Sequence, residues 1–283
     1  MKDFGGKWTI QKIEIFVKYA KAYLQIMKKH PYWKIMYFDG FAGSGEIEKN
    51  GNSYNTLIEG VAQRMLSIED PRPFDMLYFV EKDANKAKRL KYLIEEQFPD
   101  KLNITHIVTE DFNKKLHDLA NFLQHPNNKN YKVLAFVDPY GMQVEWDSLL
   151  ALKNLSIDMW ILVPTGIGVV RLLKRDGKIS NAWLDKLKIF LGLDEHEIND
   201  YFYKTETVNT LFGKETIKKK EENAISKAAE LYKSRLNEIF KHVSEPFIMK
   251  NTKGSTMFHF YMASNNSTAQ KIANDIVKPQ LKH

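Results

Sequence analysis

Cysteine is absent from the 283 residues of the chain. This excludes disulfides, thiolate nucleophiles and thiolate metal ligands. The eight histidines are scattered and none stands in an H-E-x-x-H spacing, so we expect no bound metal. No apolar run approaches the roughly 20 residues that a membrane-spanning helix needs, and the N-terminal MKDFGGKW lacks the apolar core of a secretory signal. We therefore expect a cytoplasmic protein that does not contact a membrane.

The charge of the chain is mildly basic and unevenly distributed. The formal net charge is +7, and 43% of the residues are hydrophobic, which is enough for a full core. The stretch 171–188 holds the basic residues Arg171, Lys174, Arg175, Lys178, Lys186 and Lys188. A run of this kind is most often a solvated surface, but it also suits contact with phosphates. We take Arg171, Lys174 and Arg175 as candidate contacts for a nucleic acid, either RNA or DNA.

Hydrophobic periodicity divides the chain up to Pro164 into alternating helices and strands. Apolar residues at helical spacing predict an amphipathic helix over Ile10–Met27. Beyond it, short apolar runs predict strands at 35–38, 76–80, 104–108, 133–137 and 159–163, with helices between them at 57–66, 84–97, 113–123 and 146–153. Strands that alternate with crossover helices form a parallel sheet covered on both faces. The continuous hydrophobicity of VLAFV and MWILV agrees with strands buried on both sides.

The remainder of the chain is more charged. From 166 to 243 its pattern indicates helices, in NAWLDKLKIFLGL, in HEINDYF and in the lysine- and glutamate-rich 218–243. Two strand-like runs at 246–250 and 256–262 follow, joined by the turn-forming NTKGS, and predict an antiparallel edge pair before a last helix at 268–277. We predict an α/β, Rossmann-like, doubly wound, mostly parallel seven-stranded sheet. Residues 1–165 and 244–283 would form the sheet domain, and 166–243 a helical insertion or cap.

The carboxyl ends of the first four predicted strands carry acidic residues beside turn residues or aromatics. The first strand runs into DGFAGSG (39–45), the second into Glu81 and Asp83, the third into TEDF (109–112) and the fourth into DPYG (138–141). Ligands of open parallel sheets bind outside these ends. A lone G-x-G is usually only a turn, and a strand-end glutamate is usually solvated. Their order along successive strands is what favours a binding site.

The glycines of the first strand end do not form a phosphate site. Gly43 and Gly45 allow a sharp turn and a close approach of the backbone to a ligand. No Gly-Lys-Ser/Thr follows, the G-x-G-x-x-G pattern is incomplete, and the next helix begins further on, which favours a cofactor without phosphates. Glu81 could bind two ribose hydroxyls, while Asp111 and Phe112 could bind the amino group and the face of an adenine. Together they suit S-adenosyl-L-methionine.

These motifs resemble those of class I S-adenosylmethionine-dependent methyltransferases. The order D-x-F-A-G-S-G, an acidic second strand end and D-P-Y-G is similar to enzymes that methylate exocyclic amino groups of nucleobases. WTIQKIEIFVKYAKAYL ahead of YFDGFAGSG, with FVDPYG later, resembles the three-Cys-motif partner (TcmP) family of bacteria and phages, over roughly residues 8–164. That family is named for a neighbouring gene product, a radical-SAM-like protein with three cysteines. The resemblance makes such a protein a candidate partner.

The resemblance also implies roles for individual residues. The residues implied to bind the cofactor are Asp39, Phe41, Gly43, Gly45, Glu81, Asp111 and Phe112. Asp138, Pro139 and Tyr140 would be catalytic and hold the target base. The related nucleobase methyltransferases usually have two prolines at this point, whereas this chain has DPYG, and a single-proline D-P-F-G also occurs in some guanine-N2 tRNA methyltransferases. This departure leaves the target base and the activity itself open.

The DPYG segment suits methyl transfer to an exocyclic amine, which is a poor nucleophile because its lone pair is delocalised into the ring. Asp138 and the carbonyl of Pro139 could accept hydrogen bonds from the amino group and stabilise positive charge that grows on nitrogen. Tyr140 could stack on the base, with room left by Gly141. In the structural alternative, Asp138 caps the next turn, Pro139 ends the strand and Tyr140 packs beneath the insertion.

Two further residues are weaker candidates for contact with a substrate. Lys12 borders the apolar face of the first helix, where it could reach the cleft or simply be solvated. Trp146 could be a second stacking ring, although a tryptophan on an amphipathic helix more often belongs to the core.

Other functions remain open at this stage. The chain could be a cofactor-binding module without turnover that acts through the radical-SAM-like protein, in a phage, mobile-element or defence complex. A methyltransferase for a small molecule or a protein is a third hypothesis.

Overall fold

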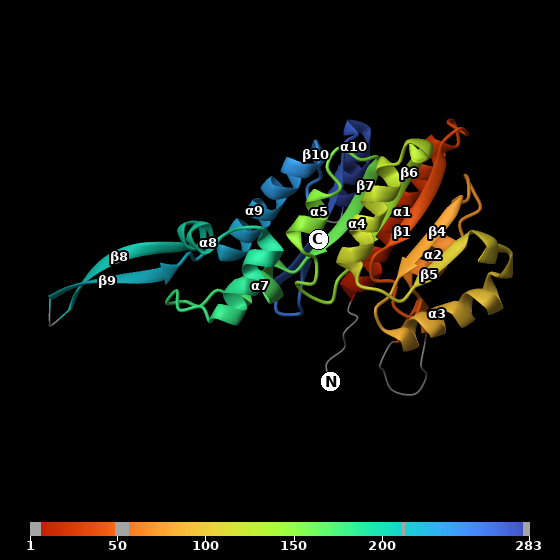
Figure 1. Ribbon diagram of the computed structural model, residues 1–283. Helices are drawn as coiled ribbons and strands as arrows, with labels where there is room; N and C mark the ends of the chain where they lie inside the picture. Colours follow the sequence, from red (N-terminus) through yellow and green to blue (C-terminus); the bar gives the residue numbers. More distant parts are fainter. Residues whose placement is uncertain (1–6, 49–56, 211–212, 280–283) are drawn as a thin grey trace.

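The computed structural model describes residues 7–48, 57–210 and 213–279. Its centre is an eight-stranded sheet in the order β10-β12-β7-β6-β1-β4-β5, with β11 also paired to β12 (Figure 1). These strands are β1 (Lys34–Asp39), β4 (Met76–Val80), β5 (Thr105–Val108), β6 (Tyr131–Val137), β7 (Ile157–Val163), β10 (His242–Val243), β11 (Phe247–Lys250) and β12 (Thr256–Ser264). The pairs from β5 to β7 are parallel, and β12 is antiparallel to β7, β10 and β11. The predicted doubly wound sheet is confirmed, with the short β10 as an additional strand.

Helices cover both faces of the sheet because its side chains alternate between two cores. Ile35 and Tyr37 of β1 face α1 (Lys7–Met27), α2 (Val61–Leu66), α3 (Ala84–Gln97) and α10 (Ser267–Val277). Met36 and Phe38 face the opposite layer, which begins with α4 (Phe112–Gln124) and α5 (Trp146–Leu150). The short helices η1 (Pro99–Ile104), η2 (Pro126–Asn128) and η3 (Thr165–Val169) join these elements. None of the helices in the described ranges is both long and apolar enough to cross a membrane.

The helix predicted at 57–66 is shorter than expected. Its first residues form β3 (Leu57–Glu59), which pairs antiparallel with β2 (Glu46–Glu48) in a separate small sheet. The helix α2 then begins after Gly60, whose backbone is extended (ψ 175°). The small sheet therefore brings Gly60 next to the glycine loop, since its N–H bonds the carbonyl of Gly45 at 3.0 Å.

The segment 166–243 contains helices and also a hairpin that was not predicted. The helices are α6 (Val170–Leu172), α7 (Asn181–Leu191), α8 (Glu195–Phe202) and α9 (Ala224–Ile239), and the hairpin strands are β8 (Tyr203–Thr210) and β9 (Gly213–Lys220). The prediction of a wholly helical segment is wrong at 203–220. The reason is the density of β-branched residues in YKTETVNT and GKETIKKK, which favour extended backbone, whereas the count of lysines and glutamates suggested a helix.

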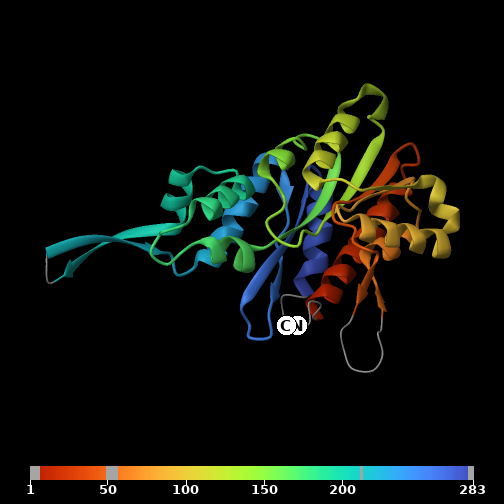
Figure 2. The ribbon, with the colours of Figure 1, turned by 60° about the horizontal axis from the view of Figure 1, so that its bottom comes forward.

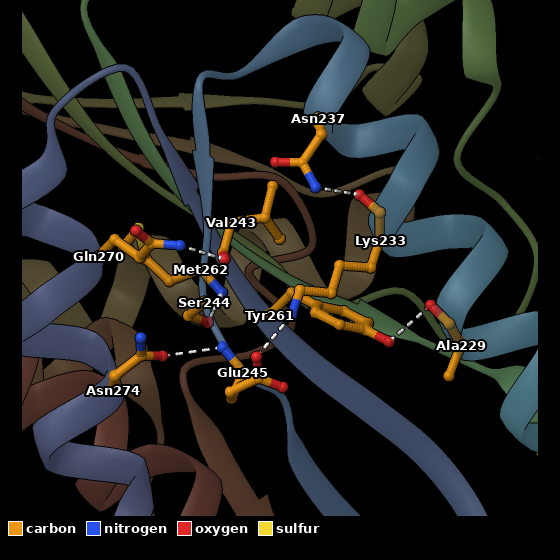
Figure 3. A network of polar contacts seen from close by, with 10 residues as sticks. All are labelled: Ala229, Lys233, Asn237, Val243, Ser244, Glu245, Tyr261, Met262, Gln270 and Asn274. Carbon is orange, nitrogen blue, oxygen red and sulfur yellow. Dashed lines mark hydrogen bonds and ion pairs between the residues drawn. The ribbon is translucent and has the colours of Figure 1, made fainter.

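Between β10 and β11, side-chain hydrogen bonds replace the strand pairing at the edge of the sheet. Pro246 has no N–H to donate, so the ladder cannot continue there. Ser244 instead exchanges two hydrogen bonds with Met262 of β12, at 2.8 and 2.9 Å. Asn274 and Gln270 of α10 bond the backbone on either side of Ser244, at 2.8 and 2.6 Å (Figure 3). The edge is thereby tied to the helix layer.

Candidate functional site

Strands β1 and β6 place two carboxylates on one face of the sheet, at its carboxyl edge. The strands are parallel neighbours in which Asp39 lies opposite Phe136. Because side chains alternate, Asp39 shares the face of Tyr37, and Asp138 shares the face of Phe136. This shared face of the sheet is covered by α1, whose residues pack in the same core as Tyr37 and Phe136.

The helix α1 supplies a buried lysine to this pair of strand ends. The ammonium of Lys12 bonds Oδ2 of Asp138, and Lys12 as a residue is only 4% exposed. The same ammonium lies 5.8 Å from the centre of the Phe136 ring. Of the two interpretations of Lys12, the structure therefore favours the one in which it reaches the cleft. The ion pair also fixes the orientation of the Asp138 carboxylate.

Replacing Lys12 with methionine is expected to lower the free energy of unfolding by about 1–3 kcal/mol at neutral pH. Breaking a fully buried ion pair costs about 3–5 kcal/mol because one charge is left unpaired, and the Asp138 side chain is 26% exposed, so water offsets part of this. Urea unfolding measures the change. The exposed Lys18 of the same helix provides the control, Lys18→Met. Equal losses for the two variants would mean that the ion pair contributes nothing.

Asp39 is a buried carboxylate with a strongly altered proton affinity. Tyr37 donates its hydroxyl to Asp39 Oδ2 at 2.8 Å, and the N–H of Phe41 donates to Oδ1 at 3.1 Å. Burial raises the pKa of Asp39 to about 7; these two hydrogen bonds oppose the rise, and the charges of Asp138 and Glu81 add to it. At neutral pH the site thus holds a carboxyl poised between its two protonation states.

The glycine loop after β1 is held by the carboxylate at the end of β4. The N–H of Gly43 donates to Glu81 Oε2 at 2.9 Å, and the N–H of Asp83 donates to Oε1 at 2.8 Å. Gly43 and Gly45 have φ of +64° and +84°, which side-chain-bearing residues rarely adopt. A Cβ at Gly43 would meet nothing within 4 Å. The loop therefore presents bare backbone to open space.

A cleft lies between these elements. Its cavity volume is about 160 Å³, which is below the roughly 300–1,000 Å³ of most small-molecule sites. Its walls come from α1, the β1 loop, the start of α2, the first turn of α3 and the end of β6, and include Lys12, Asp39, Gly43, Gly45, Lys86, Asp138 and Tyr140. Residues predicted from three separate strand and helix ends thus share one cavity.

Tyr140 stands at the mouth of this cleft with 68% of its surface exposed. Lys86 of α3 lies 4.6 Å from the centre of the ring and 3.1 Å from the hydroxyl. Gln143 braces the turn by accepting a hydrogen bond from the N–H of Tyr140 at 2.9 Å. The structural alternative, in which Tyr140 packs beneath the insertion, is therefore wrong. Pro139 is buried, and Gly141, at which a Cβ would meet nothing within 4 Å, borders open space.

Asp111 and Phe112 do not line this cleft. Asp111 caps α4 by accepting from the N–H of Asn113 at 2.9 Å, and its other oxygen bonds Lys82 at 3.1 Å. Phe112 is 3% exposed and stacks on Phe41, with ring centres 4.8 Å apart. The prediction that the Phe112 ring contacts an adenine face is corrected here, because both helix start and sheet bury that ring.

Trp146 belongs to the core and not to a substrate surface. It is 2% exposed, and Arg235 of α9 lies 4.5 Å from its ring centre. Gly192 approaches the indole so closely that a Cβ there would lie 2.1 Å from it. Tyr232 packs on its edge at 5.9 Å. Of the two interpretations of Trp146, the structure therefore supports the core residue and not the second stacking ring.

The basic candidates lie in the segment that leaves the sheet after β7. Arg171 is in α6, and Lys174 and Arg175 are in the loop that follows; all three are exposed. They do not line the cleft.

Several site residues were not predicted. Lys86 lies in the first turn after the capping Asp83, and its position behind the second strand end is the signal that could have found it. Gln143 has no comparable signal. Asn113 joins α4 to the loop after Tyr140, by donating to the carbonyl of Gln143 at 3.0 Å and accepting from the N–H of Glu145 at 2.9 Å.

No metal site accompanies the cleft in the part of the chain that the structure describes. Across residues 7–48, 57–210 and 213–279, no group of three or more His, Asp or Glu side chains is arranged to hold an ion.

Comparison with known proteins gives only distant structural likenesses. No protein-family model matches the sequence, and no curated protein sequence matches it. Among solved structures, the chain is similar to protein LPL1258 from Legionella pneumophila (14% identity, TM-score 0.43, covering 93% of this chain and 99% of the other). It is also similar to Trm1 from Pyrococcus horikoshii, solved with S-adenosyl-L-methionine (11% identity, TM-score 0.37, 90% and 63% covered). A third is the putative methyltransferase YhhF from Escherichia coli (12% identity, TM-score 0.31, 71% and 86% covered).

At these identities and TM-scores the likenesses decide nothing about this chain, and the fold follows from its own strands. The strand order, with the antiparallel β12 next to β7, makes this a Rossmann-like fold of the class I methyltransferase type. The activity has to be argued from the cleft.

Proposed function

We propose that the protein is an S-adenosylmethionine-dependent methyltransferase that acts on an exocyclic amino group of a nucleobase in RNA or DNA. The observation that carries this proposal is the cleft itself. In it, Asp138 and the exposed ring of Tyr140 at the end of β6 share one cavity with Asp39 and the bare backbone of Gly43 at the end of β1.

The residues of the cofactor half fit a ligand that is cationic and free of phosphate. Asp39 and Glu81 are carboxylates at neighbouring strand ends, and Glu81 binds the N–H of Gly43, where the backbone is open. Each oxygen of Glu81 accepts one backbone N–H and retains a second lone pair, which a ribose hydroxyl can use. In the proposal, Glu81 holds the ribose and Asp39 the methionine ammonium. When bound, the cofactor supplies an electrophilic methyl group.

Asp138 acts on the amine that receives this methyl group. Lys12 occupies Oδ2, and a carboxylate has a second oxygen with which it can accept an amino N–H. This hydrogen bond orients the nitrogen lone pair and stabilises the positive charge that grows on nitrogen as the new N–C bond would form and the methyl–sulfur bond would break. Asp138 can then receive the proton that the nitrogen loses.

Tyr140 provides the surface on which the base is held. An exposed aromatic ring stacks on a nucleobase with about 1–3 kcal/mol. Lys86 and Gln143 hold the ring and its backbone in place before any base arrives. A held geometry favours in-line methyl transfer, and a base in a duplex would have to be flipped out to reach it.

The test is transfer of radiolabelled methyl groups from S-adenosylmethionine to total RNA and, separately, to genomic DNA. Binding of the cofactor is measured in parallel by calorimetry. We expect counts in one of the two pools, and digestion to nucleosides should place the label on an exocyclic nitrogen. Label on a ring carbon or on protein would contradict the proposal, and so would intact cofactor binding with no counts in either pool.

A further inference from the structure

The β8–β9 hairpin projects from the body of the molecule, on the side of the sheet that β10 and β12 occupy (Figures 1 and 2). Its two strands of eight residues reach about 27 Å at roughly 3.4 Å per residue. From Lys204 to Thr207 and from Gly213 to Lys219 every residue is exposed. Because most side chains of this hairpin are exposed and pack into no core, packing does not explain which residues it carries.

The register sorts the charges of the hairpin onto different faces. Directly opposed residues of an antiparallel pair lie on the same face, and the next residues lie on the other. Thr205 opposes Lys218, and Thr207 opposes Thr216. With Lys214, four residues from Lys218, they form the Lys/Thr face (Thr205, Thr207, Lys214, Thr216 and Lys218). None of the described side chains of the hairpin on this face is acidic.

The opposite face has a different character. It carries Lys204 opposite Lys219, Glu206 opposite Ile217, and Val208 opposite Glu215. Both glutamates of the two strands are therefore on this mixed face. The Lys/Thr face therefore carries lysines without a glutamate, whereas lysines and glutamates are mixed on the opposite face.

The base of the Lys/Thr face meets the basic segment that follows β7. Lys220 anchors the hairpin by donating to the carbonyls of Val170 and Leu173, at 3.2 and 2.7 Å. Its N–H bonds the carbonyl of Arg175 at 2.9 Å, and Gly177 lies beside the Lys218 side chain. The exposed Lys174 and Arg175 thus extend the cationic surface of the hairpin back toward the sheet, and Asp176 is the acid among them.

We propose that the Lys/Thr face of the β8–β9 hairpin is a docking surface for duplex DNA. Lysines supply charge for phosphates, and threonine hydroxyls supply neutral hydrogen bonds. The major groove of B-form DNA, about 12 Å wide, admits a two-stranded ribbon, whereas the deep and narrow major groove of A-form RNA does not. This rests on the proposed function, in that the arm would hold the polymer whose base enters the cleft.

The test compares two double variants with the same loss of charge. Lys214→Gln with Lys218→Gln neutralises the Lys/Thr face, and Lys204→Gln with Lys219→Gln neutralises the mixed face. Fluorescence anisotropy measures binding to a DNA duplex and to an RNA duplex of the same sequence, each of about 20 base pairs, or two helical turns. Circular dichroism and thermal unfolding check that both variants fold.

We expect the Lys/Thr variant to bind the DNA duplex at least about tenfold more weakly, and the slope of log K against log salt to fall by about 1.8, or 0.9 for each phosphate contact. The mixed-face variant should change both far less. Equal losses in the two variants, tighter binding of the RNA duplex, or no DNA binding by the unaltered protein would overturn the proposal. So would a dimer that only the Lys/Thr variant dissociates.

The binding experiment needs neither cofactor nor turnover, so it separates this proposal from the proposed function. DNA binding through the arm without methyl transfer would refute only the activity. Methyl transfer that ignores the arm would refute only the docking surface.

Discussion

Replacing Asp138 with alanine is expected to reduce methyl transfer by at least about 100-fold while cofactor affinity changes by less than about threefold. Removing one preorganised group that stabilises developing charge typically costs 10²–10³ in turnover. Asp138 lines the cleft at the end of β6, whereas Asp39 lines it at the end of β1, and Glu81, after β4, binds the N–H of Gly43. Single-turnover transfer to the accepted polymer, with calorimetry for the cofactor, measures both quantities.

The alanine variant leaves Lys12 buried without its partner, so a loss of fold must be separated from a loss of chemistry. The double variant Lys12→Met with Asp138→Ala removes both charges and should unfold at higher denaturant than Asp138→Ala alone. Asp138→Asn keeps a carbonyl acceptor but not the negative charge, and should retain more activity than alanine. Transfer near the original rate in a folded Asp138→Ala protein would rule out the assigned role.

Replacing Asp39 with asparagine is expected to stabilise the protein above neutral pH while it weakens cofactor binding at least about tenfold. A rise of the Asp39 pKa from 3.8 to about 7 corresponds to about 4 kcal/mol when the group is fully ionised. Asparagine avoids this cost, because its carbonyl oxygen can accept from the N–H of Phe41 and its NH₂ group can donate to the hydroxyl oxygen of Tyr37. We expect a gain of about 2–4 kcal/mol in the free energy of unfolding, and a loss of the charge that would attract the methionine ammonium.

The stabilisation by Asp39→Asn should increase with pH. Between about pH 4 and pH 7 the folded protein binds the Asp39 proton more tightly than the unfolded chain does, so the native stability falls as pH rises through this window. The gain from Asp39→Asn should be near zero at about pH 4, grow toward pH 7 and stay constant above it. Urea unfolding at several pH values measures it, with the exposed Asp147→Asn as a control. A gain that does not change with pH would show that burial does not disfavour the ionised group.

The sheet could be predicted because each of its parallel strands is a short, continuous apolar run in the sequence. Runs such as VLAFV are too short and too continuously apolar for exposed helices, and the crossover helices between them leave little choice of topology. The shared cleft of Asp39 and Asp138 followed from the same logic, since carboxyl ends of parallel strands meet at one edge.

The remaining features depend on packing that a single sequence does not display. Whether the Phe112 ring faces a ligand or lies under Phe41 depends on how α4 sits against the glycine loop, which is a tertiary distance. In the sequence, Lys12 looks like a solvated lysine on an amphipathic helix. Only the packing of α1 over β6 buries it. The β8–β9 hairpin was missed because its lysines and glutamates suggested a helix, whereas the β-branched residues between them favour extended backbone.

The contact between Trp146 and Arg235 connects the loop after β6 with the insertion. Trp146 begins α5, a few residues after Gly141, and Arg235 joins it to the insertion by bonding the carbonyls of Leu191 and Gly192, at 3.2 and 2.9 Å. The loop after β6 and the base of the insertion are therefore locked in one continuous core. In the proposed function, the fixed separation between the hairpin and the cleft sets how far along the docked DNA duplex a base must lie to enter the cleft.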